Sequence, residues 1–223
     1  MSSGDFKRDL SVQLARIGKG LGHGNRLELL ELLAQRERSV DALADVAGLS
    51  VANTSQHLKQ LRQAGLVTSR QEGQRVFYRI NSEDVLNLLA ALRSVAEHNL
   101  ADAQQLIRNY LNRRDALEPV GRHDLLARVR DGIVDVLDVR PPEEFSAGHI
   151  PGAINVPLKN LESRLADLDP EHEIVAYCRG PHCILAFDAV ARLRQEGFKA
   201  FRLEDGFPEW KHAGFPIESS PDH

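Results

Sequence analysis

The chain has 223 residues, of which 42% are hydrophobic and 27% charged, and this composition excludes a largely disordered protein. There is no apolar run long enough for a membrane helix, no signal-peptide pattern at the N-terminus, and two cysteines cannot make a disulfide scaffold, so we expect a cytoplasmic protein without a membrane partner. The net charge of −4, taken alone, argues mildly against nucleic-acid binding.

The two halves of the chain differ in composition. All 10 prolines lie at or after Pro119. Residues 1–115 carry 16 Lys and Arg against 13 Asp and Glu, a net charge of +3, whereas residues 116–223 carry 12 against 19, a net charge of −7. We therefore predict a mainly helical domain over 1–112 and an α/β domain over 118–220, with the boundary near 112–119.

The first half shows the pattern of a winged helix-turn-helix. Asn25, Ser39 and Ser50 are suited to cap helices at their N-termini, and Gly48 is suited to end one. The apolar spacing then predicts helices over 5–16, 25–35, 39–47 and 50–64, and a hairpin made by 66–70 and 75–80. The short turn between the third and fourth helices makes them a helix-turn-helix.

A long helical stretch is predicted to follow the hairpin, from Ser82 to about Tyr110. At 1.5 Å per residue it would extend roughly 43 Å, too far to be covered by a core of this size. A second copy of the chain is the simplest cover, so we expect a homodimer that pairs through the first and last helices of the N-terminal domain.

The segment LSVANTSQHLKQLRQAGLVTSRQEGQRVFYRI, residues 49–80, resembles the ArsR family of winged-helix repressors. This resemblance implies a bacterial or archaeal homodimer that binds a palindromic operator in double-stranded DNA and is nucleoid-associated when bound. The recognition helix would enter the major groove with its polar open face, and cations would contact phosphates. The residues expected at base edges or phosphates are Ser50, Asn53, Ser55, Gln56 and His57, and those expected at phosphates are Lys59, Arg70 and Arg75.

The family's metal sites are not expected here. Members of the family often sense metals through thiols before the recognition helix, but residues 37–43 contain no cysteine. On the last helix, Glu97, His98 and Asp102 lack the family's paired spacing. We therefore predict no metal and no cofactor, and look for the sensor in the second half.

The second half alternates strands and helices. Short Ile- and Val-rich runs predict strands over 133–139, 173–177 and 199–203, and helices are predicted near 160–168 and over 184–197. This alternation is typical of a parallel sheet with helices on its faces.

A cysteine loop follows the second of these strands. Cys178 ends the strand, and the six-residue loop 178–183 leads into a helix. Loop N–H groups and the helix dipole would lower the pKa of the thiol and favour the nucleophilic thiolate, with Arg179 adding positive charge and Gly180 permitting the turn. The alternative is a buried, inert cysteine.

Three segments of this half, 135–157, 175–180 and 206–217, resemble the rhodanese family. The resemblance implies sulfur transfer through a persulfide on Cys178, and the six-residue loop distinguishes rhodaneses from related phosphatases and arsenate reductases. Asp138, Arg140, Glu143 and His149 match family motifs, and we expect them to brace the loop and the fold.

The chain departs from the rhodanese pattern at Cys183, where many members have arginine. Cys178 could take up sulfur and Cys183 attack it, which gives a disulfide or polysulfide bridge; His182 could tune either thiol. The preferred hypothesis is a regulator, expected to be a repressor, that senses sulfane sulfur or redox state. The alternatives are a DNA-tethered sulfurtransferase and an As(III)-responsive repressor that uses the two thiols.

Overall fold

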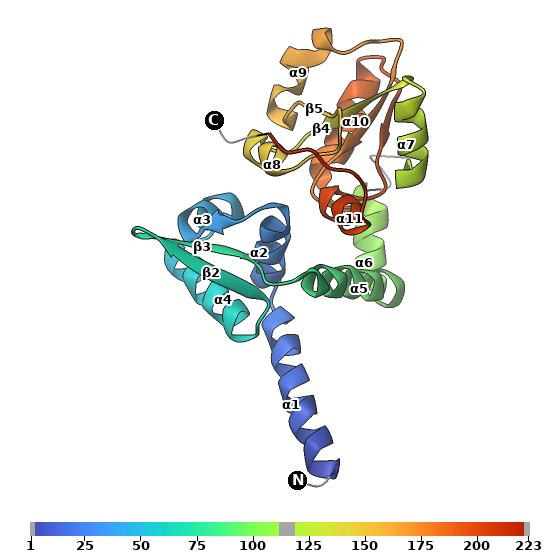
Figure 1. The fold of residues 1–223 in the computed structure, drawn as a ribbon. Coiled ribbons are helices and arrows are strands. Elements are labelled where there is room, and N and C mark those ends of the chain that lie inside the picture. Colours follow the sequence, from blue (N-terminus) through green and yellow to red (C-terminus); the bar gives the residue numbers. More distant parts are fainter. Residues whose placement is uncertain (1–2, 112–118, 221–223) are drawn as a thin grey trace. The chain divides into compact units, whose positions relative to one another are not determined.

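The computed structural model describes residues 3–111 and 119–220 (Figure 1). The chain divides into two compact units, Met1–Ala91 and Leu92–His223. The boundary expected near 112–119 lies, except for Pro119, outside the described residues. Within the described ranges, no helix combines the length and apolar character that crossing a bilayer requires.

The N-terminal unit has the expected winged helix-turn-helix architecture. Its elements are α1 (Ser3–Leu21), α2 (Gly24–Gln35), β1 (Arg38–Ser39), α3 (Val40–Ala47), α4 (Val51–Gln63), β2 (Val67–Glu72), β3 (Arg75–Ile80) and the first part of α5 (Glu83–Asn99). The strands form an antiparallel sheet in the order β1-β3-β2, and β2 and β3 make the wing. Leucines of α2, α3 and α4 are fully buried in one core.

Capping groups fix the helix-turn-helix. The Ser39 and Ser50 side chains accept hydrogen bonds from the N–H groups of Ala42 and Asn53, at 3.2 Å each, and so begin α3 and α4 as predicted. Gly48 ends α3 with a φ of 64°, a left-handed conformation that favours glycine. The predicted N-cap of α2, Asn25, is wrong by two residues. The N-cap is His23, whose ring nitrogen Nδ1 accepts a hydrogen bond from the Asn25 N–H.

The prediction of one long helix over 82–110 is also wrong. The chain turns extended at Leu100, which separates α5 from α6 (Ala101–Leu106) and a π-helical turn, η1 (Ile107–Leu111). Side chains compete for the carbonyls at the break: Asn99 Nδ2 donates to the Val95 oxygen, and Gln104 Nε2 donates to the His98 oxygen. Polar residues at this point therefore end the helix without proline or glycine.

The C-terminal unit is an α/β fold around a parallel sheet in the order β5-β4-β6-β7. The sheet consists of β4 (Val134–Asp138), β5 (Ile154–Asn155), β6 (Glu173–Tyr177) and β7 (Ala200–Arg202), and the helices are α7 (Arg122–Arg130), α8 (Pro142–Ala147), α9 (Leu161–Arg164), α10 (Ile184–Gln195) and α11 (Phe207–His212). Two 3-10 turns, Leu158–Asn160 and Leu165–Asp167, flank α9.

Both faces of this sheet are covered, which explains its continuous apolar strands. Alternate residues of β6 enter different cores: Ile174 and Ala176 pack with α9 and α10, whereas Val175 and Tyr177 pack with α7 and α11. The strands β4, β6 and β7 and the helices α9 and α10 were predicted, but the short strand β5 and the helices α7, α8 and α11 were not. The end of β6 delivers the cysteine loop.

Candidate cysteine-loop site and DNA-binding surface

The cysteine loop joins β6 to α10. Cys178 directly follows β6 and is 1% exposed, and Cys183 is the N-cap of α10. Their Cα atoms lie 6.1 Å apart and their sulfur atoms are joined as a disulfide, a Cα separation within the ordinary disulfide range. Because Cys183 caps a 12-residue helix, the positive end of the helix dipole favours a thiolate there when the pair is reduced.

Arg179 points to a carboxylate that the sequence analysis missed. Its Nη2 donates to Glu144 Oε1 at 2.7 Å, and its Nε donates to Glu144 Oε2 at 3.0 Å. Glu144 is fully buried, whereas Glu143, the predicted brace, is exposed on α8. Arg179 therefore braces the loop through this pair, and its charge is largely neutralised by Glu144.

A buried ion pair lies beneath the loop. Arg140 and Asp138 are both fully buried, with Nη2 of the arginine 2.6 Å from Oδ2 of the aspartate. The same Nη2 donates to the Gly148 oxygen at 2.7 Å, and the guanidinium lies 4.3 Å from the ring centroid of Phe207. Phe207 in turn donates its N–H to the Cys178 carbonyl at 3.0 Å, so the ion pair supports the loop through Phe207.

Gly206 makes the closest backbone approach to the loop. A Cβ built on it would lie 2.2 Å from the Gly180 nitrogen and 2.5 Å from the Arg179 carbonyl carbon. These atoms belong to the backbone, which cannot rotate away. Only glycine at position 206 therefore lets α11 begin against the loop.

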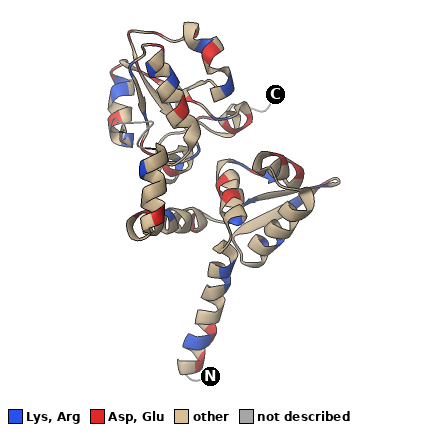
Figure 2. Ribbon diagram, turned by 180° about the vertical axis from the view of Figure 1, so that it is seen from behind, with Lys and Arg blue, Asp and Glu red and all other residues tan. Residues whose placement is uncertain are grey.

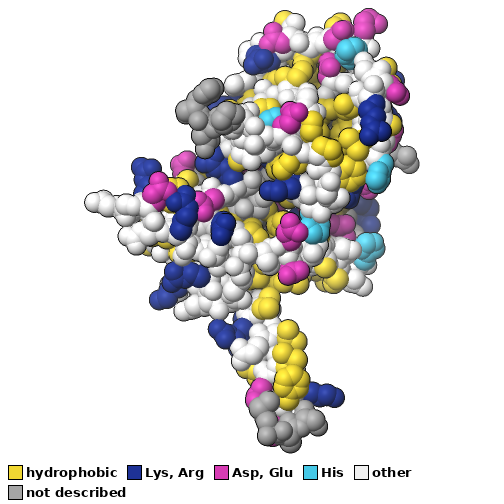
Figure 3. Space-filling view, viewed as in Figure 1, with side chains coloured by type: hydrophobic (Ala, Val, Ile, Leu, Met, Phe, Trp, Pro, Cys, Tyr) yellow, Lys and Arg dark blue, Asp and Glu magenta, His cyan; other side chains and the backbone are white. Residues whose placement is uncertain are grey.

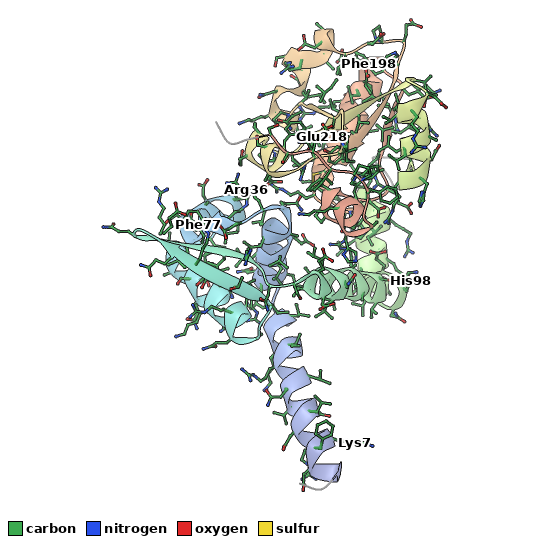
Figure 4. The ribbon with its side chains drawn as sticks, in the orientation of Figure 1. Lys7, Arg36, Phe77, His98, Phe198 and Glu218 are labelled. Atoms are coloured by element: carbon green, nitrogen blue, oxygen red, sulfur yellow. A yellow bond between two sulfur atoms is a disulfide. The ribbon has the colours of Figure 1, made fainter. Side chains whose placement is uncertain are left out.

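His149 braces the C-terminal segment instead of the loop. Its ring stacks on Phe145 with centroids 3.7 Å apart, and its Nδ1 lies 2.9 Å from the Phe145 oxygen. Backbone hydrogen bonds join His149 to Glu218 in both directions, and Glu218 is labelled in Figure 4. Of the predicted supports, Asp138 and Arg140 thus lie beneath the loop and His149 lies elsewhere.

Two charge pairs lie beside the loop within the C-terminal unit. His182 Nε2 is 3.4 Å from Glu97 Oε1, and Arg93 Nη1 is 2.9 Å from Glu209 Oε1. Burial lowers the pKa of His182 from its ordinary value, although Glu97 acts in the opposite direction. Through its contact with Glu97, His182 links the loop to α5.

The recognition helix α4 exposes most of the residues predicted to contact DNA. Asn53, Ser55, Gln56 and Lys59 are exposed on α4, next to the exposed cap Ser50. Figure 2 marks the basic positions of the chain in blue. The exposed positions on α4 leave one polar face open to an external ligand.

The outward placement of His57 is wrong. His57 is 7% exposed, its ring centroid lies 4.5 Å from that of His23, and its Nδ1 has no hydrogen-bond partner among the described residues. Burial and the neighbouring His23 lower the pKa of His57. Its spacing from Thr54 and Leu61 places it on the buried face of α4, a periodicity that the sequence already displays.

The two predicted arginines of the wing differ in their surroundings. Arg70 Nε donates to Glu37 Oε1 at 2.7 Å, Arg70 also pairs with Glu72, and its guanidinium covers the ring of Phe77, labelled in Figure 4. Arg75 is exposed beside the turn Gly73–Gln74, and no ion pair joins it to another described residue. Arg75 is thus the better placed of the two to meet a phosphate.

Comparisons with known proteins decide the family. The model of the arsR family of bacterial regulatory proteins matches residues 23–69, and the model of the rhodanese-like domain matches 122–213. An HTH-type transcriptional regulator of Mycobacterium tuberculosis is 45% identical over 96% of this chain and 94% of its own length. The chain belongs to the ArsR family. It is a transcriptional regulator of that family with a rhodanese-like domain.

Two further similar proteins each match less than half of this chain. A sulfurtransferase of Allochromatium vinosum is 30% identical over 37% of the chain and 76% of its own length. The solution structure of a homodimeric winged helix-turn-helix domain from a possible ArsR-family regulator of Mycobacterium bovis is 43% identical, covers 46% of this chain and 94% of its own, and has a TM-score of 0.42.

Proposed function

We propose that this ArsR-family regulator binds operator DNA as a homodimer and that the thiol state of Cys178 and Cys183 sets its operator affinity. The observation that carries the proposal is the pairing of these two cysteines across the loop between β6 and α10, where Cys183 replaces the arginine of many rhodaneses. A second thiol in this position converts a sulfur-accepting site into a dithiol that can be closed and reopened.

Reactive sulfur is the proposed signal. The Cys178 thiolate attacks the outer sulfur of a persulfide R–S–SH, which leaves as R–S⁻ and yields Cys178–S–SH. The Cys183 thiolate then attacks the Cys178 sulfur, forms the disulfide and expels HS⁻. The dithiol loses two electrons and the sulfane sulfur gains them. The closed loop is then the oxidised, signalling state.

The dimer follows from α1. Phe6, Leu10 and Leu14 are 53%, 46% and 60% exposed and recur every four residues, which places them on one face of the helix. Figure 3 shows hydrophobic side chains along α1. A stripe of this kind on a charged surface helix favours burial against another apolar surface, and we assign it to a second copy.

Operator binding with and without polysulfide tests the proposal. We expect polysulfide to lower the operator affinity of the wild type by about tenfold or more, a coupling within the usual allosteric range. Cys178→Ser should bind the operator as the reduced wild type does and ignore polysulfide. Mass spectrometry of Cys183→Ser should show a persulfide retained on Cys178. If Cys178→Ser releases DNA like the wild type, the sensor proposal is wrong.

Arg75→Ala should weaken operator binding at all sequences. Each protomer would lose one phosphate contact, so the slope of log affinity against log salt should become shallower by about 1 per protomer. Fluorescence anisotropy over a salt series measures both quantities. Arg79→Ala is the matched control, because Arg79 is also an exposed cation and lies farther from the turn on the same strand. Equal slopes for Arg75→Ala and the wild type would remove Arg75 from the interface.

A sulfurtransferase role is the second candidate, favoured by the rhodanese-like domain over residues 122–213 and by the similarity of 37% of the chain to the Allochromatium sulfurtransferase. Steady-state sulfur transfer from thiosulfate to cyanide distinguishes the two, since a sensor needs only one turnover. Treatment with arsenite tests the third candidate, because operator release by As(III) but not by polysulfide would favour metalloid sensing. Among the residues that the structure describes, no group of three or more metal-ligating side chains is arranged to hold an ion.

A further inference from the structure

A cavity of about 440 Å³ lies beside the cysteine loop, within the C-terminal unit. His182 and Ile184, the two neighbours of Cys183, line one side. The other lining residues come from α5, α6 and η1; they include Arg93 and Glu97 but are mainly apolar, among them Ala103 and Ile107. The volume is within the range of small-molecule sites, roughly 300–1,000 Å³.

The charged groups of this cavity are already paired. Arg93 contacts Glu209, and Glu97 contacts His182, so each charged side chain of the lining has a partner of opposite or titratable charge. An anion that entered would have to break one of these pairs to gain a cation. An uncharged apolar molecule instead gains burial against Ile107 and Ile184 without that cost.

We propose that this cavity binds the alkyl groups of uncharged organic polysulfides, such as dialkyl trisulfides, and presents their sulfur to Cys183. The inference rests on the proposed function, because it names the class of sulfur donor that this loop accepts. A dialkyl trisulfide enters at Cys183, unlike the smaller persulfide proposed above to react with Cys178, because Cys183 lies between two lining residues and is partly exposed, whereas Cys178 is buried.

The reaction closes the loop in two exchanges. The Cys183 thiolate attacks an outer sulfur of R–S–S–S–R, expels R–S–S⁻ and forms Cys183–S–S–R. The Cys178 thiolate then attacks the Cys183 sulfur, forms the protein disulfide and expels R–S⁻. The dithiol supplies two electrons, the trisulfide is reduced to a persulfide and a thiol, and the protons of the two cysteines go to these products or to water.

Ala103→Phe tests the cavity, since it fills the apolar side from α6. The reduced full-length protein is treated with dipropyl trisulfide or with glutathione trisulfide, which has the same sulfur chain on charged substituents, and disulfide formation is followed by mass spectrometry. We expect the wild type to react about tenfold or more faster with the dipropyl compound, and Ala103→Phe to lose that preference. Ala101→Phe, an exposed position on the same helix, should keep it. Cys178→Ser should accumulate the propyl mixed disulfide on Cys183.

Three results would overturn the inference. Equal slowing of both donors by Ala103→Phe would mean a distorted loop, and no slowing would mean that the cavity is not used. A loss of dimer in sedimentation with an unchanged donor preference would assign the apolar face to a second copy. Operator affinity is measured separately for the reduced and the disulfide forms. If the two affinities are equal, the proposed function fails while the donor preference stands.

Discussion

Gly206→Ala is expected to destabilise the rhodanese-like unit by about 1–3 kcal/mol, the usual cost of overpacking, or by more. The added Cβ would meet the backbone of Gly180 at 2.2 Å, so α11 and the cysteine loop must move apart. That movement breaks the hydrogen bond from the Phe207 N–H to the Cys178 carbonyl. Trp210, the sole tryptophan of the chain, is fully buried on α11, and its fluorescence during urea unfolding reports this unit directly.

Gly121→Ala is the matched control for this substitution. Gly121 is also a helix N-cap with extended backbone, but a Cβ there meets nothing closer than 3.9 Å. The free energy of unfolding of Gly121→Ala should stay within about 1 kcal/mol of the wild-type value, so its urea midpoint should change little. A midpoint for Gly206→Ala that matches this control would show that the close approach of loop and helix is not required.

Arg140→Met should cost about 3–5 kcal/mol, the penalty for leaving a buried charge without its partner. Asp138 is fully buried and loses its guanidinium, and the Gly148 carbonyl loses a donor at the same time. Urea unfolding followed through Trp210 measures the loss. Because Arg140 also packs on Phe207, we expect the closed loop to be less protected from reductant in this variant.

The double variant Asp138→Asn with Arg140→Met separates charge from packing. It removes the stranded carboxylate, so it should be more stable than Arg140→Met alone. Arg164→Met is the surface control, because the Arg164–Asp167 pair has side chains 47% and 57% exposed and should contribute less than about 1 kcal/mol. If the double variant is no better than the single one, packing around the methylenes of Arg140 carries the effect.

Much of the fold could be predicted because local signals agree with packing. Ser39 and Ser50 cap their helices, Gly48 ends one, and the apolar run of β6 is buried on both faces, so periodicity and capping suffice to place them. The break at Leu100 could not be predicted in this way, because it depends on which carbonyls the Asn99 and Gln104 side chains reach. No breaker residue marks it.

The site was predicted unevenly for the same reason. Cys178 and Cys183 follow from chain order alone, since a strand, a loop and a helix fix their positions. The partner of Arg179 depends on which face of α8 is buried. The helix buries Glu144 and exposes its neighbour Glu143, and the sequence does not distinguish these two adjacent glutamates. His57 was misplaced although Thr54 and Leu61 define the buried face of its helix.

The division of the chain at Ala91 and Leu92 falls inside α5, so one helix has its N-terminal turns in the first unit and its C-terminal turns in the second. Val85 and Leu89 belong to the winged-helix core, while Arg93 and Glu97 pair with residues of the rhodanese-like unit. A cut between 112 and 118 would therefore separate the cavity residues of α5, α6 and η1 from His182 and Ile184. A cut at the boundary between the two units would pass through α5, and each fragment would keep only part of that helix.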